Sequence, residues 1–120
     1  MAKKASKLSD DEIARRLSSL PRWRRDGDFI CRRFETYGWK GTLMVINAVG
    51  HLCEAAWHHP DLAASYDWVE VRLQTHDAGG LSARDFELAE KIEELVAWRP
   101  GAESALEGTP ADDRYAYIKE

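Results

Sequence analysis

The stretch Glu54-Ala55-Ala56-Trp57-His58-His59-Pro60 decides the fold, because it marks the point where the chain changes from helix to sheet. Before it, residues 39–57 repeat apolar side chains at a helical period, which predicts one long helix. Pro60 has no N–H to donate and disfavours helical backbone in the residue before it, so the helix must end nearby. After it, residues 68–75 alternate apolar and polar side chains, which predicts a strand with one buried face. The helical stripe is expected to contain Val45, Val49, Leu52 and Ala56, with Leu43, Ile46 and Cys53 beside it.

The sequence before residue 39 predicts a short helix followed by a hairpin. Ser9 and Glu12 have capping-box spacing, in which the hydroxyl and the carboxylate each accept from an N–H of the first turn. Pro21 is expected to stop this helix. The dipeptide Asp26-Gly27 tolerates the positive φ angles of a type I′ turn, so it predicts a hairpin. The hairpin strands are expected within residues 23–25 and 29–34, and the apolar stripe of the helix contains Ile13, Leu17 and Leu20.

The second half of the chain predicts two strands and a final helix. Residues 61–66 are expected to pair with residues 68–75, with Asp67 near the turn. Ser82 and Asp85 repeat the capping-box spacing and predict the start of a helix. The element order is then helix-strand-strand-helix-strand-strand-helix, which predicts an α+β fold: a four-stranded antiparallel sheet with three helices packed on one face. The last helix is expected to bury Leu88, Ile92 and Leu95.

One domain accounts for most of the chain. Residues 8–98 are expected to form it, after a flexible N-terminal segment of residues 1–7. Residues 99–120 are rich in proline and glycine and predict a tail without a core of its own. A frayed end is the default expectation for such a tail. Three side chains near its end offer a way to dock it onto this or another subunit, namely Tyr115, Tyr117 and Ile118.

Composition narrows the classes of protein to consider. The chain has 120 residues, of which 44% are hydrophobic and 32% charged, typical of a single globular domain. We find no apolar run long enough for a membrane span and no apolar stretch after the N-terminus of the kind a secretory signal needs. Cys31 and Cys53 match no metal or redox spacing, so we expect free, packed thiols and a cytoplasmic protein.

The charges are unevenly distributed along the chain. Residues 1–40 carry 11 Lys and Arg against 6 Asp and Glu, whereas residues 41–120 carry 6 against 15. Arginines near residues 22–25 and 32–33 therefore raise the question of a nucleic-acid surface. We interpret them instead as solvent-facing arginines that protect the edge of the sheet, because a chain with a net charge of −4 repels phosphate.

Three histidines lie at the ends of predicted elements. His58 and His59 follow the long helix and His76 follows the last strand, so they are candidates to line one cleft. Unperturbed histidine titrates near neutral pH, and a cluster can therefore supply both a proton donor and a proton acceptor. Two other interpretations remain open: the adjacent pair satisfies carbonyls at a helix C-terminus, or the three bind zinc. We expect no metal, because neighbouring side chains rarely point at one ion. His51 is expected to be solvated.

Two carboxylates accompany these histidines. Glu54 precedes His58 by one helical turn, so its carboxylate is placed to orient that imidazole or to contact a ligand. An ordinary surface glutamate is the alternative. Asp85 is most simply explained by the capping box.

The ordered set of an acid, a His-His-Pro triplet, an aromatic residue, a third histidine and an aspartate resembles the signature of the pterin-4a-carbinolamine dehydratases. The resemblance implies loss of water from a 4a-hydroxytetrahydropterin, giving quinonoid dihydropterin with no cofactor, by a homo-oligomer that is most simply a dimer. His58 and His76 would then be the acid–base pair, and His59 would help to hold the pterin. By the same resemblance the substrate-binding residues would be Glu54, Trp57, Asp77 and Asp85.

The chain departs from the family pattern at one position beside the histidine pair. Trp57 stands where family members more usually have a small or polar residue. Three stretches, residues 39–47, 106–110 and 117–119, are similar to the dehydratase-like proteins that accompany α-carboxysomes. In that branch the resemblance implies a chaperone-like dimer that assembles Rubisco subunits. We therefore carry two hypotheses forward, an acid–base dehydratase and a Rubisco assembly factor.

Overall fold

The computed structural model describes residues 5–120 and contains a four-stranded antiparallel sheet in the order β1-β2-β4-β3. Part of the expected flexible N-terminal segment, residues 1–4, lies outside the described residues. The two central strands bury one face completely, with Phe34 opposite Val69. The strands are β1 (Arg24–Asp26), β2 (Phe29–Glu35), β3 (Asp61–Ser65) and β4 (Trp68–Leu73).

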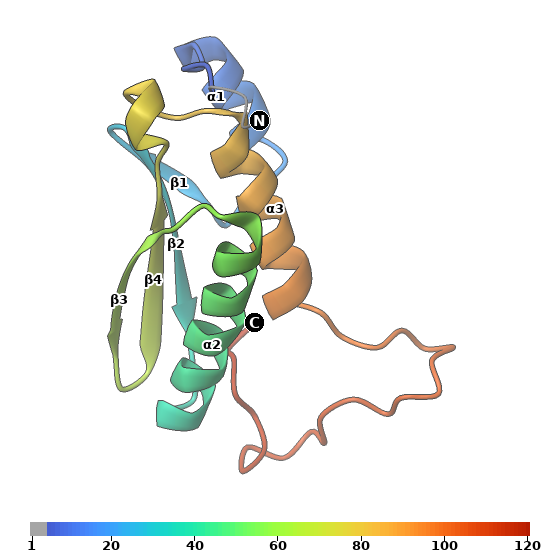
Figure 1. Cartoon of the computed structure of the whole chain (residues 1–120). Helices are drawn as coiled ribbons and strands as arrows, with labels where there is room; N and C mark the ends of the chain where they lie inside the picture. Colours follow the sequence, from blue (N-terminus) through green and yellow to red (C-terminus); the bar gives the residue numbers. More distant parts are fainter. Residues whose placement is uncertain (1–4) are drawn as a thin grey trace.

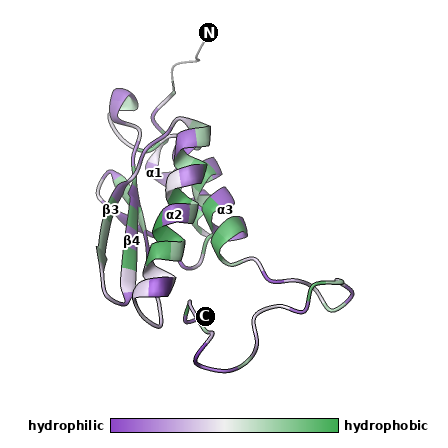
Figure 2. Ribbon diagram, turned by 60° about the horizontal axis from the view of Figure 1, so that its bottom comes forward, coloured by the Kyte–Doolittle hydropathy of each residue, from purple (hydrophilic) through white to green (hydrophobic). Residues whose placement is uncertain are grey.

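The helices cover one face of this sheet, as the sequence predicted (Figure 1). The long helix α2 and the last helix α3 lie side by side against it, and the short helix α1 lies near the N-terminal end of α3. Figure 2 shows apolar stretches on β4, α2 and α3. The helices are α1 (Asp10–Leu17), α2 (Trp39–Ala56) and α3 (Ala83–Val96), with a one-turn 3-10 helix η1 (His76–Ala78) that carries too few residues for a periodic signal.

The core is formed by the inner face of the sheet and one stripe of each long helix. The predicted alternation of the last strand is confirmed, because every second side chain of β4 is buried. The predicted stripe of α2 is partly wrong: Leu52 is only half-buried and Ala56 is exposed. These two residues face the groove between α2 and α3 rather than the sheet. The buried residues of α2 are Gly41, Thr42, Val45, Val49 and Cys53, and those of α3 include Phe86, Leu88, Ala89 and Ile92.

Local turn chemistry differs in two places from the prediction. In the hairpin, Asp26 pairs with Phe29, so the turn residues are Gly27 and Asp28. Of these two only Gly27 has a positive φ, of 59°, which is the sign pattern of a type II′ turn rather than type I′. At α1, Ser9 caps the helix as predicted, but the carboxylate of Glu12 bonds to arginines one turn further on.

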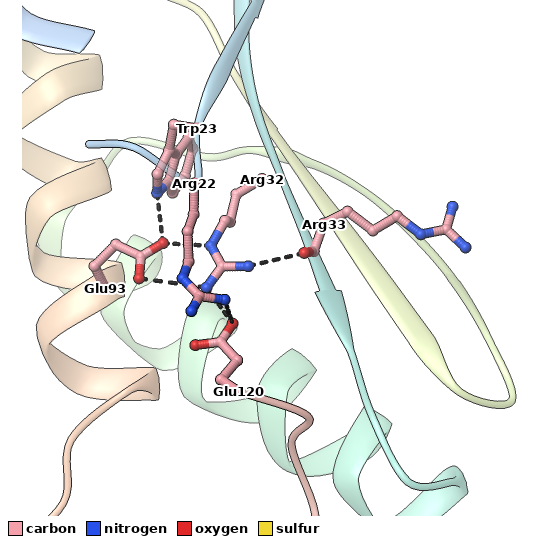
Figure 3. Close-up of polar contacts among 6 residues, drawn as sticks. All are labelled: Arg22, Trp23, Arg32, Arg33, Glu93 and Glu120. Atoms are coloured by element: carbon pink, nitrogen blue, oxygen red, sulfur yellow. Dashed lines mark hydrogen bonds and ion pairs between the residues drawn. The ribbon is translucent and has the colours of Figure 1, made fainter. Parts of the chain in front are cut away.

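Arg32 corrects the expectation of solvent-facing arginines. It lies on the helix-facing side of β2 with only 3% of its surface exposed. Its guanidinium pairs with Glu93 of α3 and with Glu120 at the C-terminus (Figure 3). Its charge also lies over the Phe34 ring. The indole N–H of Trp23 also donates to Glu93, at 2.7 Å. A buried charge needs such partners, so this arginine belongs to the core and not to a nucleic-acid surface.

The tail leaves the body after α3 and returns to it at its end (Figure 1). Ile118 is buried and forms a bridge to Thr36 at the end of β2, so the tail docks onto its own chain rather than fraying. The backbone passes so close to α2 that a Cβ on Gly41 would lie 2.0 Å from the carbonyl oxygen of Tyr117. Glycine is therefore required at position 41 for the tail to dock in this way.

The described chain, residues 5–120, has no helix that is both long and apolar enough to cross a lipid bilayer.

Candidate functional site

The site begins at the C-terminal end of α2, where Trp57 reverses the chain. Its backbone is left-handed, with φ 54° and ψ 45°, and the N–H of His58 returns to the carbonyl of Cys53 at 3.1 Å. This turn separates the two adjacent histidines. His58 faces α3 and is largely covered, whereas His59 is exposed.

Glu54 does not orient His58, which corrects the expectation from helical spacing. Its Oε1 lies 2.8 Å from Nε2 of His59 instead. The reason is the left-handed residue between them: the i to i+4 relation holds only along a continuous helix, and α2 ends at Ala56. Both members of this pair are more than half exposed, so the pair contributes little to stability.

His58 is oriented by Asp85, at the start of α3. Its Nε2 lies 2.6 Å from Oδ1 of that carboxylate, which is completely buried. The other oxygen of Asp85 accepts from the hydroxyl of Thr75 at 2.8 Å and from the N–H of Ser82 at 2.9 Å. Donors therefore satisfy both oxygens, as a buried carboxylate requires. With Nε2 engaged, Nδ1 is the nitrogen of His58 left for proton exchange with a ligand.

A hollow of about 440 Å³ lies beside His58, between α2 and α3. This volume is within the usual range for a small-molecule site. His58 and Trp57 line it at the end of α2, and α3 adds both apolar and charged side chains. The complete lining is Leu52, Ala56, Trp57, His58, Arg84, Glu87, Leu88 and Lys91.

Apart from His58 and Trp57, the predicted site residues do not line this hollow, namely Glu54, His59, His76, Asp77 and Asp85. His76 and Asp77 are exposed on η1, which follows β4 directly. Thr75 precedes His76 and bonds to the carboxylate that holds His58, so the ends of α2, β4 and α3 converge there. Within residues 5–120 we find no group of three or more His, Cys, Asp or Glu side chains that is arranged to hold a metal ion.

Cys53 and Tyr66 differ in burial. Cys53 is 1% exposed, and burial raises the pKa of its thiol to about 11. This thiol is therefore neutral and unreactive near pH 7. Tyr66, in contrast, is exposed at the turn after β3, with its hydroxyl beside Gly38.

Sequence reasoning missed the α3 wall of the hollow and the polar partners of Asp85. Arg84, Glu87 and Lys91 recur at helical spacing on α3, so a charged stripe could have been read from the sequence. The sequence does not reveal that this stripe faces α2, because its direction depends on how the two helices pack. Thr75 was predicted only as part of a strand, and its bond to Asp85 depends on the same packing.

Comparisons with known proteins agree with this fold. The structure is similar to that of a Brucella melitensis protein described as a transcriptional coactivator/pterin dehydratase, with a TM-score of 0.72 over 76% of this chain and 99% of that one, at 24% identity. It is also similar, with a TM-score of 0.53 over 65% of this chain and 90% of that one, to a pterin dehydratase-like protein described as a RuBisCO assembly factor of the alpha-carboxysome, at 20% identity. Both likenesses show the fold, which is that of the pterin dehydratases.

Sequence similarity is stronger. The model of the pterin 4 alpha carbinolamine dehydratase family matches residues 6–95. Two relatives named after this enzyme are 49% identical over 90 residues, in Aquifex aeolicus, and 44% identical over 92 residues, in Natronomonas pharaonis. These matches cover 75% and 77% of this chain, and 91% and 98% of the relatives. The chain belongs to the pterin-4a-carbinolamine dehydratase family, and its function is that of this hydro-lyase.

Proposed function

We propose that the chain removes water from 4a-hydroxytetrahydrobiopterin or a close analogue, with His58 as the central acid–base group. The observation that carries this proposal is the bond from His58 to the buried carboxylate of Asp85, on the wall of a hollow of about 440 Å³. A carboxylate in this position fixes the orientation of the ring and its tautomer.

The proposed reaction needs two proton transfers and no change in oxidation state. The C4a–O bond breaks and its oxygen takes a proton from the acid, so that it leaves as water. A base takes a proton from a ring nitrogen, and the electron pair of that N–H bond becomes a new ring double bond. Two imidazoles in opposite protonation states supply both transfers. We assign them to His58 and His76, as the family resemblance implies, with His59 helping to hold the pterin.

Replacement of histidines by alanine tests this assignment, with the loss of water followed spectroscopically. We expect His58→Ala and His76→Ala each to lower kcat by about 10²-fold or more, since one positioned proton transfer typically contributes 10²–10⁴. His51→Ala is the matched control, because His51 lies exposed on α2, outside the lining of the hollow. Turnover by the wild-type protein no faster than the spontaneous reaction would refute the proposal.

A homodimer is part of the same proposal. The edge strand β3 supports it, because all five of its residues are exposed and its outer backbone groups have no strand beside them in the described chain. Light scattering that gives the mass of one chain at micromolar concentration would contradict it.

The second candidate function is assembly of Rubisco. One support is the similarity of residues 39–47, 106–110 and 117–119 to the dehydratase-like proteins that accompany α-carboxysomes. The other is the docked end of the tail, where residues 117–119 contact β2 and α2. Co-expression with Rubisco subunits tests it. A higher yield of assembled Rubisco than with a chain truncated after residue 98 is expected, and equal yields would remove this candidate.

A further inference from the structure

Two buried hydroxyl groups lie behind the carboxylate of Asp85. Thr75 is 1% exposed, and Ser82 is completely buried. The hydroxyl of Thr75 donates to Oδ2 of the carboxylate at 2.8 Å and lies 2.5 Å from the hydroxyl of Ser82. Burying a hydroxyl is unfavourable unless it is hydrogen-bonded, and an apolar side chain would fill the same space without this cost. Packing alone therefore does not explain a threonine at position 75.

The hydrogen bonds of these hydroxyls all point toward Asp85. A hydroxyl has one proton to donate, and that of Thr75 is used on the carboxylate, so Thr75 accepts in its contact with Ser82. Ser82 in turn accepts from the N–H of Arg84, at 3.3 Å. Consecutive bonds that point the same way polarise and strengthen one another. This chain ends on the carboxylate whose other oxygen holds His58.

The backbone of Thr75 fixes the loop that carries His76. The N–H of Thr75 donates to the carbonyl of Gly80 at 3.0 Å, and the bridge between these two residues closes the loop of residues 76–79. Thr75 is therefore connected to His76 by one peptide bond, and by one hydrogen bond to the carboxylate that orients His58.

We propose that Thr75 is a positioning residue for the dehydration, which sets His58 and His76 relative to one another. This inference rests on the proposed function. The hydroxyl acts through the carboxylate of Asp85 and not on the substrate. Without it, Oδ2 would keep only the N–H of Ser82 as a donor, and the carboxylate would be free to turn. A turning carboxylate releases the imidazole that it orients, and acid–base catalysis needs that ring within hydrogen-bond reach of the substrate.

Thr75→Val tests this assignment, because valine is close to threonine in shape and lacks the hydroxyl. We expect kcat for loss of water to fall by about tenfold to 10²-fold, since a displacement of about 1 Å in a catalytic group costs up to about 10² in rate. KM should not change, because the hydroxyl does not bind substrate. Thr75→Ser restores the hydroxyl and should keep most of the wild-type kcat. An equal loss of kcat in both variants would overturn the assignment.

Thr36→Val is the matched control for folding. Thr36 is completely buried, and its hydroxyl also pairs with a second buried hydroxyl, that of Thr42, at 2.8 Å. It follows β2 at the end of the sheet opposite to Thr75, because β2 and β4 are antiparallel. We expect this variant to lower the melting temperature, as Thr75→Val does, and to keep the wild-type kcat. A kcat that falls equally in both variants would mean that lost stability, not lost positioning, lowers the rate.

Proton NMR of the imidazole N–H of His58 gives a readout that needs no turnover. An imidazole N–H held by a carboxylate exchanges slowly with water and resonates downfield, and His58→Ala assigns the signal. We expect the signal to be lost or broadened in Thr75→Val and to remain in Thr75→Ser. It should also remain in Thr36→Val. An unchanged signal in Thr75→Val would overturn the inference.

A double-mutant cycle on kcat shows whether the hydroxyl acts through Asp85. In the background of Asp85→Asn, Thr75→Val should lower kcat much less than it does in the wild type, because the two residues act along one route. The full loss in both backgrounds would contradict that route. Wild-type turnover no faster than the spontaneous reaction would refute the proposed function, and the imidazole signal would still decide whether Thr75 positions His58.

Discussion

Asp85 uses its two oxygens for two different roles. Oδ2 accepts from the N–H of Ser82 and completes the capping box of α3, while Oδ1 holds His58. The sequence predicted the first role, because a capping box is local. The second joins residues 27 apart in the chain and depends on the packing of α2 against α3. The residue that starts a helix therefore also orients the histidine at the proposed site.

Cys53 makes the stability of the protein depend on pH in the alkaline range. Burial raises the pKa of its thiol from 9.0 to about 11. Below pH 9 the thiol is neutral in both states, so its contribution to stability is complete. Between pH 9 and 11 the unfolded chain loses this proton and the folded chain does not, so the free energy of unfolding falls by up to about 2–3 kcal/mol.

Denaturant unfolding of the wild type and of Cys53→Ala at several pH values between 8 and 11 checks this prediction. The variant should be less stable at pH 8, and the difference between the two proteins should shrink as the pH rises. A difference that stays constant over this range would show that Cys53 titrates alike in both states.

At the scale of the elements, regular periodicity was enough to predict the helices and strands. The alternation in β4 and most of the stripe in α3 reflect burial on one side, which is a local pattern. Leu95, which was expected in the α3 stripe, is exposed instead. The face of Arg32 could not be predicted, because an arginine at a core position looks like an ordinary surface residue until Glu93 and Glu120 are placed beside it. The type of the hairpin turn depended on one φ angle, that of Asp28, which composition does not determine.

The docking of the tail onto β2 predicts a measurable loss of stability when its charge is removed. Glu120→Gln should lower the free energy of unfolding by about 1–3 kcal/mol, since Arg32 is 3% exposed and loses a charged partner. Glu107→Gln is the matched control, because Glu107 lies exposed in the same tail. Equal unfolding curves for both variants and the wild type would mean that the end of the tail does not stabilise the body.

At the scale of the whole molecule, the chain combines the family domain with a C-terminal tail whose end packs against that domain. The family model ends at residue 95, yet residues 117–120 supply a buried side chain and a partner for Arg32. The sequence pointed to Tyr117 and Ile118 as docking residues but not to the surface that receives them, because that surface forms only after β2 and α2 have packed. Residues 99–116 form the connection between these two anchored ends.

The sequence predicted the residue types of the site better than it predicted their geometry. His58 and Asp85 were both named from the sequence, the latter as a support of the pocket through family resemblance. Glu54 was assigned to the wrong histidine, because the left-handed backbone of Trp57 interrupts the helical spacing. His59 and His76 remain predictions for the site, to be tested by turnover.

The most direct test of the central claim is a double-mutant cycle on kcat for loss of water from 4a-hydroxytetrahydrobiopterin, with His58→Ala, Asp85→Asn and the double variant compared as folded proteins. If Asp85 acts by orienting His58, Asp85→Asn lowers kcat and the double variant is no slower than His58→Ala alone, because the two residues act as one unit. Losses that multiply in the double variant, or an unchanged kcat for Asp85→Asn, would contradict the account.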